Sequence, residues 1–426
     1  MSRRALPGVF LCSVAGIVLW EVIARIYAGS FVFAGPLAVA TYLVQHGGLI
    51  TRAVIATASA ATWGFVWGNI AAILMASVAF LLPRSQRVIS AFALIVFCLP
   101  LVASGPILRV LYGTGDGPQI TLAALAVYYT TYLALLVGLH AIPHSWSDLV
   151  HVYGKGRLTE LFHIRARASL PYFIAGVQVA IPAAFLGAMI GEFTGAERGL
   201  GVLTLRAMRG LDVNATWAVA TVAAGVVMIA YGIIGWLARR LIGYLPVLLL
   251  TPPHSNKPVR LWRQLLEIVV ITIAAILVWH FLMEVFSLNR FFAKRPLDVW
   301  TYLTSTEGAM GTLYSALAET ISLVIPGYFG GLVLGVGLAA LLILIPRFAT
   351  VALPISIALR SIPIITTAPL IVLALGRGAS GTITIVAVMI FFPTLVTCLQ
   401  GLRQAPAQII DAVSYTHLTL PTILLV

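Results

Sequence analysis

Charge and cysteine are both scarce in this sequence. Only 9% of the 426 residues are charged and 61% are hydrophobic, whereas a soluble globular domain has about 25% charged residues. This composition excludes an ordinary soluble domain. Each of the three cysteines is isolated in an apolar stretch. We therefore expect Cys12, Cys98 and Cys398 to be free, buried thiols that form neither a disulfide nor a metal site.

Two kinds of motif are also missing. No G-x-x-x-x-G-K-[ST] stretch, the phosphate-binding loop of nucleotide hydrolases, occurs, and no cluster of acid, base and nucleophile is visible. We therefore expect no catalytic residues and no directly bound cofactor. The formal charge of +13 would suggest nucleic acid in a soluble protein. Here the cations stand mostly at the ends of apolar runs, which favours membrane topology and no nucleic-acid partner.

Long apolar runs are what the sequence has instead. About 20 consecutive apolar residues cross a bilayer only as a helix, so we predict an all-α integral membrane protein, a polytopic helical bundle in the lipid bilayer. The N-terminal run imitates a signal peptide but is too long for one, and we interpret it as an uncleaved first span. The expected spans are residues 7–28, 54–82, 88–112, 119–141, 171–193, 214–246, 265–287, 313–345, 350–375 and 381–402.

The placement of arginines predicts the topology. Arg3-Arg4 precede the first expected span, and a basic loop at 143–171 follows the fourth. Because positive charge gathers in cytoplasmic loops, we expect both the N-terminus and this loop in the cytoplasm. This topology places three arginines on the extracytoplasmic side, against the rule that positive charge gathers in cytoplasmic loops: Arg198, Arg206 and Arg209.

Glycines and prolines recur in register between the two halves of the chain. A shift of 263 residues, without a gap, superimposes them over about ninety positions, which predicts an internal duplication. Six spans return a chain to its starting side, so the two copies are expected to be parallel repeats related by an axis along the membrane normal. The matched pairs include Gly64 and Gly327, Gly68 and Gly331, Pro100 and Pro363, Pro106 and Pro369, and Asp148 and Asp411.

The duplication divides the chain into segments. We expect a first six-span unit at 1–246, a cytoplasmic linker at 247–264 and an incomplete second unit of four spans at 265–413. After residue 413 the correspondence stops. The tail at 414–426 is expected to be foreign to a truncated second copy, because a missing loop and two missing spans would leave helix faces unpartnered. A chain that naturally ends there is the alternative.

A polar, basic stretch interrupts the first half at Asp148–Pro171. It contains four cations against two acids, and three apolar residues recur at the spacing of one helix face. A cationic, one-faced helix between two spans lies either on lipid headgroups or in a groove of a soluble partner, and both remain open at this point. The cations are Lys155, Arg157, Arg165 and Arg167, and the apolar residues are Leu158, Leu161 and Phe162.

The same stretch resembles a known family. Asp148-Leu149-Val150 is followed after three residues by Gly154 and after nine more by Ile164, and Leu170-Pro171 comes next. This spacing is similar to the cytoplasmic loop of the permease subunits of ABC importers, the binding-protein-dependent transport inner-membrane components. The segment GEFTGAERGLG at 191–201 resembles the nitrate/sulfonate/taurine branch. The sequence departs from the family at Ala166-Arg167, where the family has Leu-Pro.

The resemblance implies a mechanism and partners. The loop would dock in a cleft of cytoplasmic ABC ATP-binding subunits, which use the ATP. An extracytoplasmic solute-binding protein would deliver a small anionic solute, and the permease, itself no enzyme, would lie in a bacterial inner membrane. The residues implied to form the ATPase-coupling loop are Asp148, Gly154, Arg157, Leu158, Leu161, Phe162 and Ile164, with Asp411 at the repeat position of Asp148.

Six residues are candidates for the translocation path. An ionisable group inside a membrane segment can mark a substrate path, and prolines free backbone carbonyls that can line a cavity. The alternatives are a cap for Glu192, a snorkelling or paired side chain for Arg360, and simple packing kinks for the prolines. The candidates are Glu192, Arg360, Pro100, Pro106, Pro363 and Pro369.

Two other functions stay open from the sequence. An ion-coupled secondary transporter with parallel repeats would need ionisable pairs inside the membrane, and the sequence has few. A membrane enzyme acting on lipid or quinone would need a clustered catalytic set.

Overall fold

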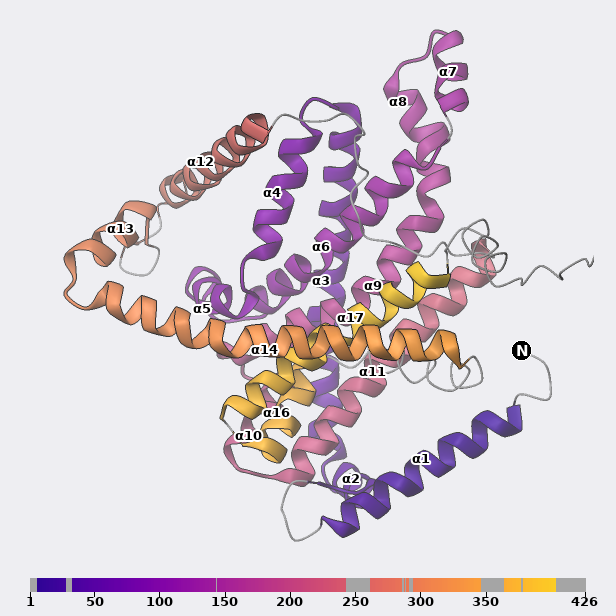
Figure 1. The fold of residues 1–426 in the computed structure, drawn as a ribbon, viewed down its shortest axis with the longest axis vertical. Coiled ribbons are helices and arrows are strands. Elements are labelled where there is room, and N and C mark those ends of the chain that lie inside the picture. Colours follow the sequence, from indigo (N-terminus) through magenta and orange to yellow (C-terminus); the bar gives the residue numbers. More distant parts are fainter. Residues whose placement is uncertain are drawn as a thin grey trace, which may run out of the picture. The chain divides into compact units, whose positions relative to one another are not determined.

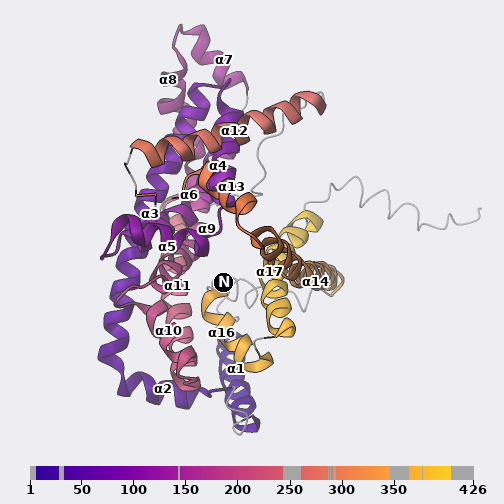
Figure 2. The same ribbon diagram turned by 90° about the vertical axis from the view of Figure 1, so that its left-hand side faces the viewer.

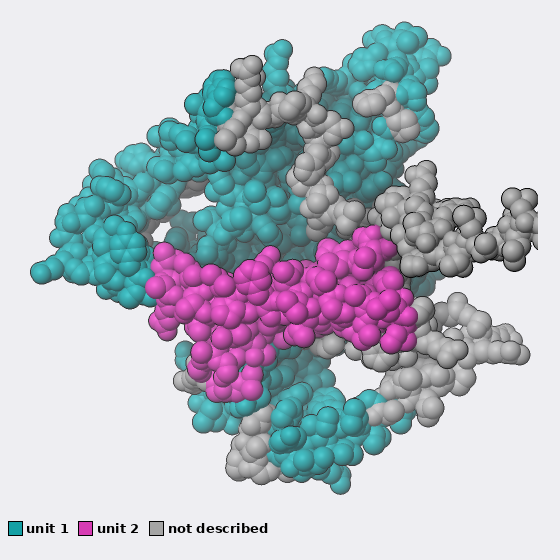
Figure 3. Space-filling model, in the orientation of Figure 1, with its two compact units in different colours: residues 1–316, 361–374 teal, residues 317–360, 375–426 magenta. Residues whose placement is uncertain are grey.

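A computed structural model describes residues 6–27, 33–142, 144–242, 261–285, 287, 289–290, 294–345, 364–376 and 378–403. These residues form helices and turns, and no strand occurs among them. The chain divides into two compact units, residues 1–316 with 361–374 and residues 317–360 with 375–426, which Figure 3 distinguishes by colour.

The helices follow the apolar runs, and a short π-helical turn, η2, interrupts them. In chain order they are α1 Leu6–Ile26, α2 Pro36–Gln45, α3 Gly47–Leu81, α4 Gln86–Cys98, α5 Leu101–Tyr112, α6 Gly117–His140, α7 His144–Val152, α8 Arg157–Glu160, η2 Leu161–Arg165, α9 Ala166–Phe193, α10 Leu200–Arg209, α11 Val213–Ile242, α12 Leu261–Val285, α13 Pro296–Ser305, α14 Ala309–Leu344, α16 Ile364–Leu375 and α17 Ala379–Arg403.

Seven helices in the described part of the chain are long and apolar enough to cross a membrane. The prediction of an all-α polytopic membrane protein is therefore confirmed. Residues 88–112 were predicted to form one span. They form two helices, α4 and α5, which meet at an angle of 88°. Pro100 is the residue before α5 and has no N–H to continue the ladder, whereas Pro106 lies inside the continuous α5. Of the expected span 350–375, residues 350–363 lie outside the described residues.

Small residues bring α3, α6 and α9 together in unit 1. A Cβ atom on Gly64 or Gly68 of α3 would overlap α6, and one on Gly187 or Gly191 of α9 would overlap the α6 backbone. Lipid is as apolar as leucine, so helix association inside a membrane depends on such close packing. The three helices form the centre of unit 1, which the two ribbon views show from perpendicular sides (Figure 1, Figure 2).

The helix pair inside unit 2 repeats these contacts. Gly327 and Gly331 of α14 face α17 at residues that are each 263 positions beyond the α6 residues faced by Gly64 and Gly68. The four residues of the hydrophobic core cluster in unit 2, shifted back by 263, all fall in one core cluster that contains residues of α3 and α6. The packing inside each unit therefore agrees with the sequence repeat. The unit 2 residues are Ala339, Leu342, Leu395 and Leu399, and their equivalents are Ala76, Ala79, Tyr132 and Leu136.

The tyrosines of α6 hold α4 by hydrogen bonds. Tyr128 Oη donates to the Ala93 carbonyl at 2.5 Å, and Tyr132 Oη lies 2.6 Å from Ser90 Oγ. Cys98, the last residue of α4, is exposed. The expectation of burial is wrong for this thiol, because residues 97–100 at the bend after α4 are all exposed, and Cys398 is only half-buried.

The close glycine contacts give a first prediction. Gly64→Ala and Gly327→Ala should each destabilise the chain by about 1–3 kcal/mol, because overpacking forces helices apart. Gly225→Ala in α11 is the matched control, since nothing lies within 4 Å of its added Cβ. Thermal unfolding of the detergent-purified variants measures the effect. Equal stability of Gly64→Ala and Gly225→Ala would contradict the packing role.

Candidate functional site

The loop at 143–171 forms a helical hairpin at one end of unit 1. Helices α7 and α8 project beyond the ends of α6 and α9, while α2 and α10 lie at the other end of the unit (Figure 1, Figure 2). The single expected helix is thus two helices, α7 and α8, joined by a turn at 153–156.

A glycine cap ends α7 and makes the turn. The N–H of Lys155 donates to the Val150 carbonyl at 3.1 Å, and the N–H of Gly154 donates to the His151 carbonyl at 2.9 Å. These two bonds are a Schellman motif, which needs a left-handed residue after the helix. Gly154 has φ +66°, and a Cβ there would meet open space. The requirement for glycine at this position is therefore conformational and not steric.

The predicted apolar stripe separates into buried and exposed residues. Leu161 is only 4% exposed and packs in a core cluster, whereas Leu158 is 60% exposed and Phe162 is 66% exposed. Ile164 is half-buried, and Asp148 and Arg157 are exposed. The exposed apolar residues of the hairpin form what we call the apolar tip: Trp146, Leu149, Val152, Tyr153, Leu158 and Phe162.

A buried ion pair lies at the base of this hairpin. Arg165 Nε lies 2.7 Å from Glu160 Oε1, and the two side chains are 12% and 3% exposed. Ser147 Oγ lies 2.5 Å from the same carboxylate oxygen and accepts a hydrogen bond of 2.6 Å from Arg165 Nη2. A cavity of about 230 Å³ lies beside the pair, lined also by His140, His151 and Arg157.

This arrangement corrects one expectation. Arg165 was expected to face either lipid headgroups or a soluble partner, but its guanidinium turns inward to Glu160. Arg167 is exposed, as expected for a surface cation. Neither Ser147 nor Glu160 stands out in the sequence, because a helix of ordinary periodicity does not bring residues 160 and 165 together.

A second buried carboxylate lies at the opposite end of α9. Glu192 Oε1 accepts a hydrogen bond from Thr57 Oγ1 at 2.6 Å, and Glu192 Oε2 accepts one from the Gly201 N–H at 2.5 Å. Thr57 Oγ1 also accepts the Leu200 N–H at 2.8 Å. A Cβ at Gly199, whose φ is +139°, would overlap the carboxylate. These contacts make Glu192 and Thr57 a cap for the start of α10.

Three other pathway candidates, all prolines, lie within the described residues. Pro100 lies at the bend between α4 and α5, Pro106 lies inside α5, and Pro369 lies inside α16. Arg360, Pro363 and Asp411 lie outside the described residues. The assignments to the pathway and to the coupling loop therefore stay predictions.

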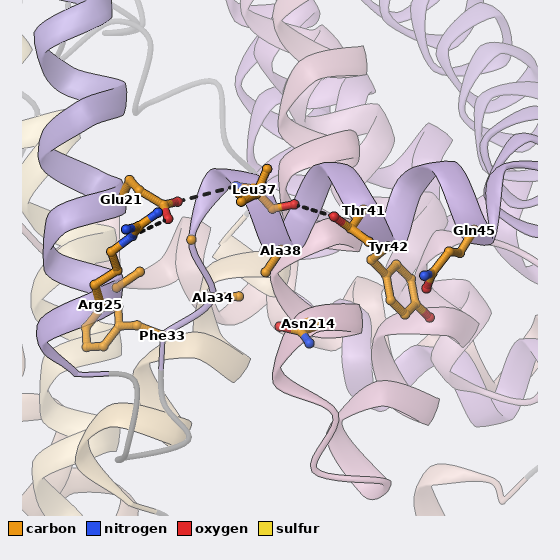
Figure 4. Close-up of a pocket in the computed structure, with 12 residues that line it drawn as sticks. Glu21, Arg25, Phe33, Ala34, Leu37, Ala38, Thr41, Tyr42, Gln45 and Asn214 are labelled. Carbon is orange, nitrogen blue, oxygen red and sulfur yellow. Dashed lines mark hydrogen bonds and ion pairs between the residues drawn. The ribbon is translucent and has the colours of Figure 1, made fainter.

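A larger cavity, of about 500 Å³, lies among α1, α2 and α11 at the end of unit 1 opposite the hairpin (Figure 4). Glu21 and Arg25 on its rim form an ion pair of 2.9 Å, and the Leu37 N–H donates to Glu21 at 3.4 Å. Burial raises the pKa of Tyr42, and the Asp212 carboxylate raises it further. The charged groups on the rim satisfy one another, and no sequence motif marks this cavity.

The α10 cap gives a second prediction. Thr57→Val keeps the side-chain shape but removes one donor to Glu192 and one acceptor for Leu200, so it should destabilise the protein by about 1–3 kcal/mol. Thr62→Val in the same helix is the control, because Thr62 is exposed and bonds only its own helix, to the Ala58 carbonyl. Thermal unfolding compares the two. If Thr62→Val lowers the stability as much as Thr57→Val does, the stabilising role of the α10 cap is ruled out.

Known proteins share the part of the chain that contains both carboxylates. Residues 68–243 match the family of binding-protein-dependent transport system inner membrane components. The Probable ABC transporter permease protein of Haemophilus influenzae is 28% identical over 253 residues, which cover 57% of this chain and 99% of that protein. The formylaminopyrimidine transport permease protein ThiX of Halalkalibacterium halodurans is 22% identical over 196 residues, or 46% of this chain and 78% of ThiX.

A third relative is named for aliphatic sulfonates transport. This permease protein, SsuC of Escherichia coli, is 24% identical over 140 residues, which cover 33% of this chain and 50% of SsuC. The family match includes the hairpin, the buried ion pair, Glu192 and α10, whereas Thr57 of the cap lies before the matched residues. These relatives are all named as transport permeases. The resemblance seen in the loop sequence is thereby confirmed. Residues 68–243 of this multi-pass membrane chain therefore belong to the ABC importer permeases, the binding-protein-dependent inner-membrane components.

Proposed function

We propose that the hairpin at 143–171 is the coupling loop of an ATP-driven importer and docks into separate cytoplasmic ATP-binding subunits. The apolar tip is the observation that supports this most. Its six large apolar side chains are exposed at the end of unit 1, among exposed cations such as Lys155 and Arg157. An apolar patch with a polar rim marks a protein interface, and a short helix laid in a groove is a common mode of recognition.

If the hairpin docks into cytoplasmic ATP-binding subunits, the orientation of the chain in the membrane and the positions of its other partners follow. The hairpin and the N-terminus would lie in the cytoplasm of a bacterium. The end of unit 1 that contains α2 and α10 would then face the extracytoplasmic solute-binding protein. ATP would be bound and hydrolysed by the partner subunits, and this chain would bind no cofactor itself.

We further propose that the chain contains two parallel copies of a permease unit. Nearly the whole Haemophilus relative aligns with 57% of this chain, and the core contacts of unit 2 repeat those of α3 and α6 with the shift of 263 residues. Both observations support a fused pair. One chain would then supply both halves of a translocation path.

The solute is proposed to be small and anionic, of the nitrate, sulfonate or taurine kind. SsuC, named for aliphatic sulfonates, supports this class, and ThiX, named for formylaminopyrimidine, marks the range of solutes among relatives. Arg206 and Arg209 are exposed in the last turn of α10, at the end opposite the hairpin. Exposed cations at that entrance would raise the local concentration of an anion.

Purification from the native membrane tests this function. The tagged chain should capture an ATPase, and liposomes that contain the complex should take up taurine, an alkanesulfonate or nitrate when ATP is enclosed with the ATPase and the solute-binding protein is outside. Uptake that needs an ion gradient but no ATPase would instead favour an ion-coupled transporter.

The apolar tip gives a third prediction. Leu158→Asp should weaken ATPase capture by about tenfold, because truncating or charging an interface anchor costs more than about 1 kcal/mol. Leu211→Asp is the control at the opposite end of unit 1, where the leucine is 67% exposed with φ +51°, a conformation that aspartate tolerates. Quantitative co-purification compares the variants. Equal capture by both would exclude the tip as the docking surface.

Gly154 gives a fourth prediction. Gly154→Ala should strain the turn by about 1–2 kcal/mol, because a Cβ disfavours positive φ, and it should lower solute uptake per ATP hydrolysed without preventing membrane insertion. Gly156→Ala is the control, because Gly156 has φ −86° and also faces open space. The ratio of uptake to ATP hydrolysis in liposomes measures the effect. An unchanged ratio for Gly154→Ala would remove the turn from the mechanism.

A further inference from the structure

We propose that Ser147, Glu160 and Arg165 are positioning residues that fix the coupling hairpin to the ends of α3 and α6, so that hairpin and bundle move as one body. This inference rests on the proposed docking of the hairpin. We call these three side chains the clamp.

One guanidinium joins three separate elements. Arg165, at the end of η2, donates from Nε to Glu160 at the end of α8 and from Nη2 to Ser147 in α7. Its Nη1 donates to the Leu139 carbonyl in the last turn of α6. That carbonyl is one of the terminal groups of α6 without a partner in its own helix. The planar guanidinium of Arg165 thereby holds together the α7–α8 turn, the start of α9 and the end of α6.

The end of α3 closes the arrangement from another side. The Arg165 guanidinium lies over the Phe80 ring, 4.7 Å from its centroid. Arg157, on the first turn of α8, donates to the Leu81 carbonyl at 3.4 Å. The hairpin therefore touches α3 through two independent cationic side chains. A push on the apolar tip reaches both α3 and α6 through these contacts.

The π-helical turn makes the clamp geometrically possible. In an α-helix of 3.6 residues per turn, side chains five positions apart point about 140° away from each other. In the turn at Leu161–Arg165 the extra residue brings Glu160 and Arg165 onto one side. A π-turn is rarer and less favourable than a continuous helix and is frequent at functional sites. The local backbone is thus adapted to the ion pair.

Energetics favours a positioning role over a purely stabilising one. Burying two charges costs desolvation that their attraction only partly offsets, and an apolar pair of the same volume often stabilises a protein as well or better. Removing one partner alone is costly because it leaves a buried, unpaired charge. Removing both charges should therefore restore stability, but it cannot restore the directional bonds that orient the hairpin.

The experiment separates these two effects. Arg84→Cys and Ser145→Cys, both exposed positions outside the apolar tip, receive spin labels after Cys12, Cys98 and Cys398 are replaced by serine. The distance distribution is measured in lipid nanodiscs for the parent, for Glu160→Gln, for Arg165→Gln and for the Glu160→Gln/Arg165→Gln double variant. Arg167→Gln is the matched control, the same substitution at an exposed arginine two residues away. Thermal unfolding is recorded for each variant.

The expected result is a narrow distance for the parent and for Arg167→Gln. Each single variant should have a lower melting temperature and a broader distance distribution than the parent. The double variant should have the parental melting temperature but should still have a broad distance distribution. A double variant with parental stability and a parental distance would overturn the proposal. If the double variant fails to insert, Ser147→Ala decides, because loss of its hydroxyl should broaden the distance and a parental distance would refute the clamp.

A second arm shows which proposal has failed. In the complex with co-purified ATPase, ATP and vanadate should leave the parental label distance unchanged and should shift it in the double variant. A parent that captures no ATPase contradicts the docking proposal, and the distances without nucleotide still decide the clamp. A double variant whose distance stays fixed under ATP and vanadate contradicts the clamp alone.

Discussion

Helices inside a bilayer gain nothing from leaving lipid, so the bundle of this permease depends on how closely the backbones of α3, α6 and α9 approach one another. The glycines of α3 and α9 meet the α6 backbone without room for a Cβ. Close packing of this kind has one geometry, because a single added methyl group forces a helix to shift. The recurrence of the same contacts inside unit 2, with the same displacement in sequence, indicates that this geometry is what the two halves of the chain have in common.

Tight packing also decides how polar groups can be placed. A carboxylate at the edge of such a bundle has no water to rely on and must be satisfied by the protein. Glu192 is satisfied by Thr57 and by the N–H of Gly201, and the small residues of the G-L-G segment leave space for it. Glu160 is satisfied by Ser147 and Arg165. Both carboxylates therefore act through hydrogen bonds that fix helix ends, and the same chemistry explains why the acidic residue and the two glycines occur together in the sequence.

The sequence predicted what depends on composition and periodicity. Apolar length located the spans, and the glycines that mark the repeat, Gly64 and Gly68 with Gly327 and Gly331, prove to be points of close helix contact. It did not predict the inward turn of Arg165, because helix periodicity assumes 3.6 residues per turn and η2 departs from it. It also did not predict the Thr57–Glu192 bond, which joins residues 135 positions apart. Such a contact depends on the tertiary path of two helices, and a single sequence contains no local signal for it.

The two carboxylates suggest how force travels through unit 1. Helices α3 and α9 contact each other and are joined at two separate places, by Thr57 and Glu192 near the α10 end and by Phe80 and Arg165, the residue before α9, near the hairpin. Two helices fixed at two places cannot slide past one another without breaking a buried polar contact. A displacement of the hairpin would therefore move α3 and α9 together, without bending them. This movement would displace α10, which lies at the far end of α9. On the proposed mechanism, this is how an event at the cytoplasmic face changes the solute entrance on the other side of the membrane.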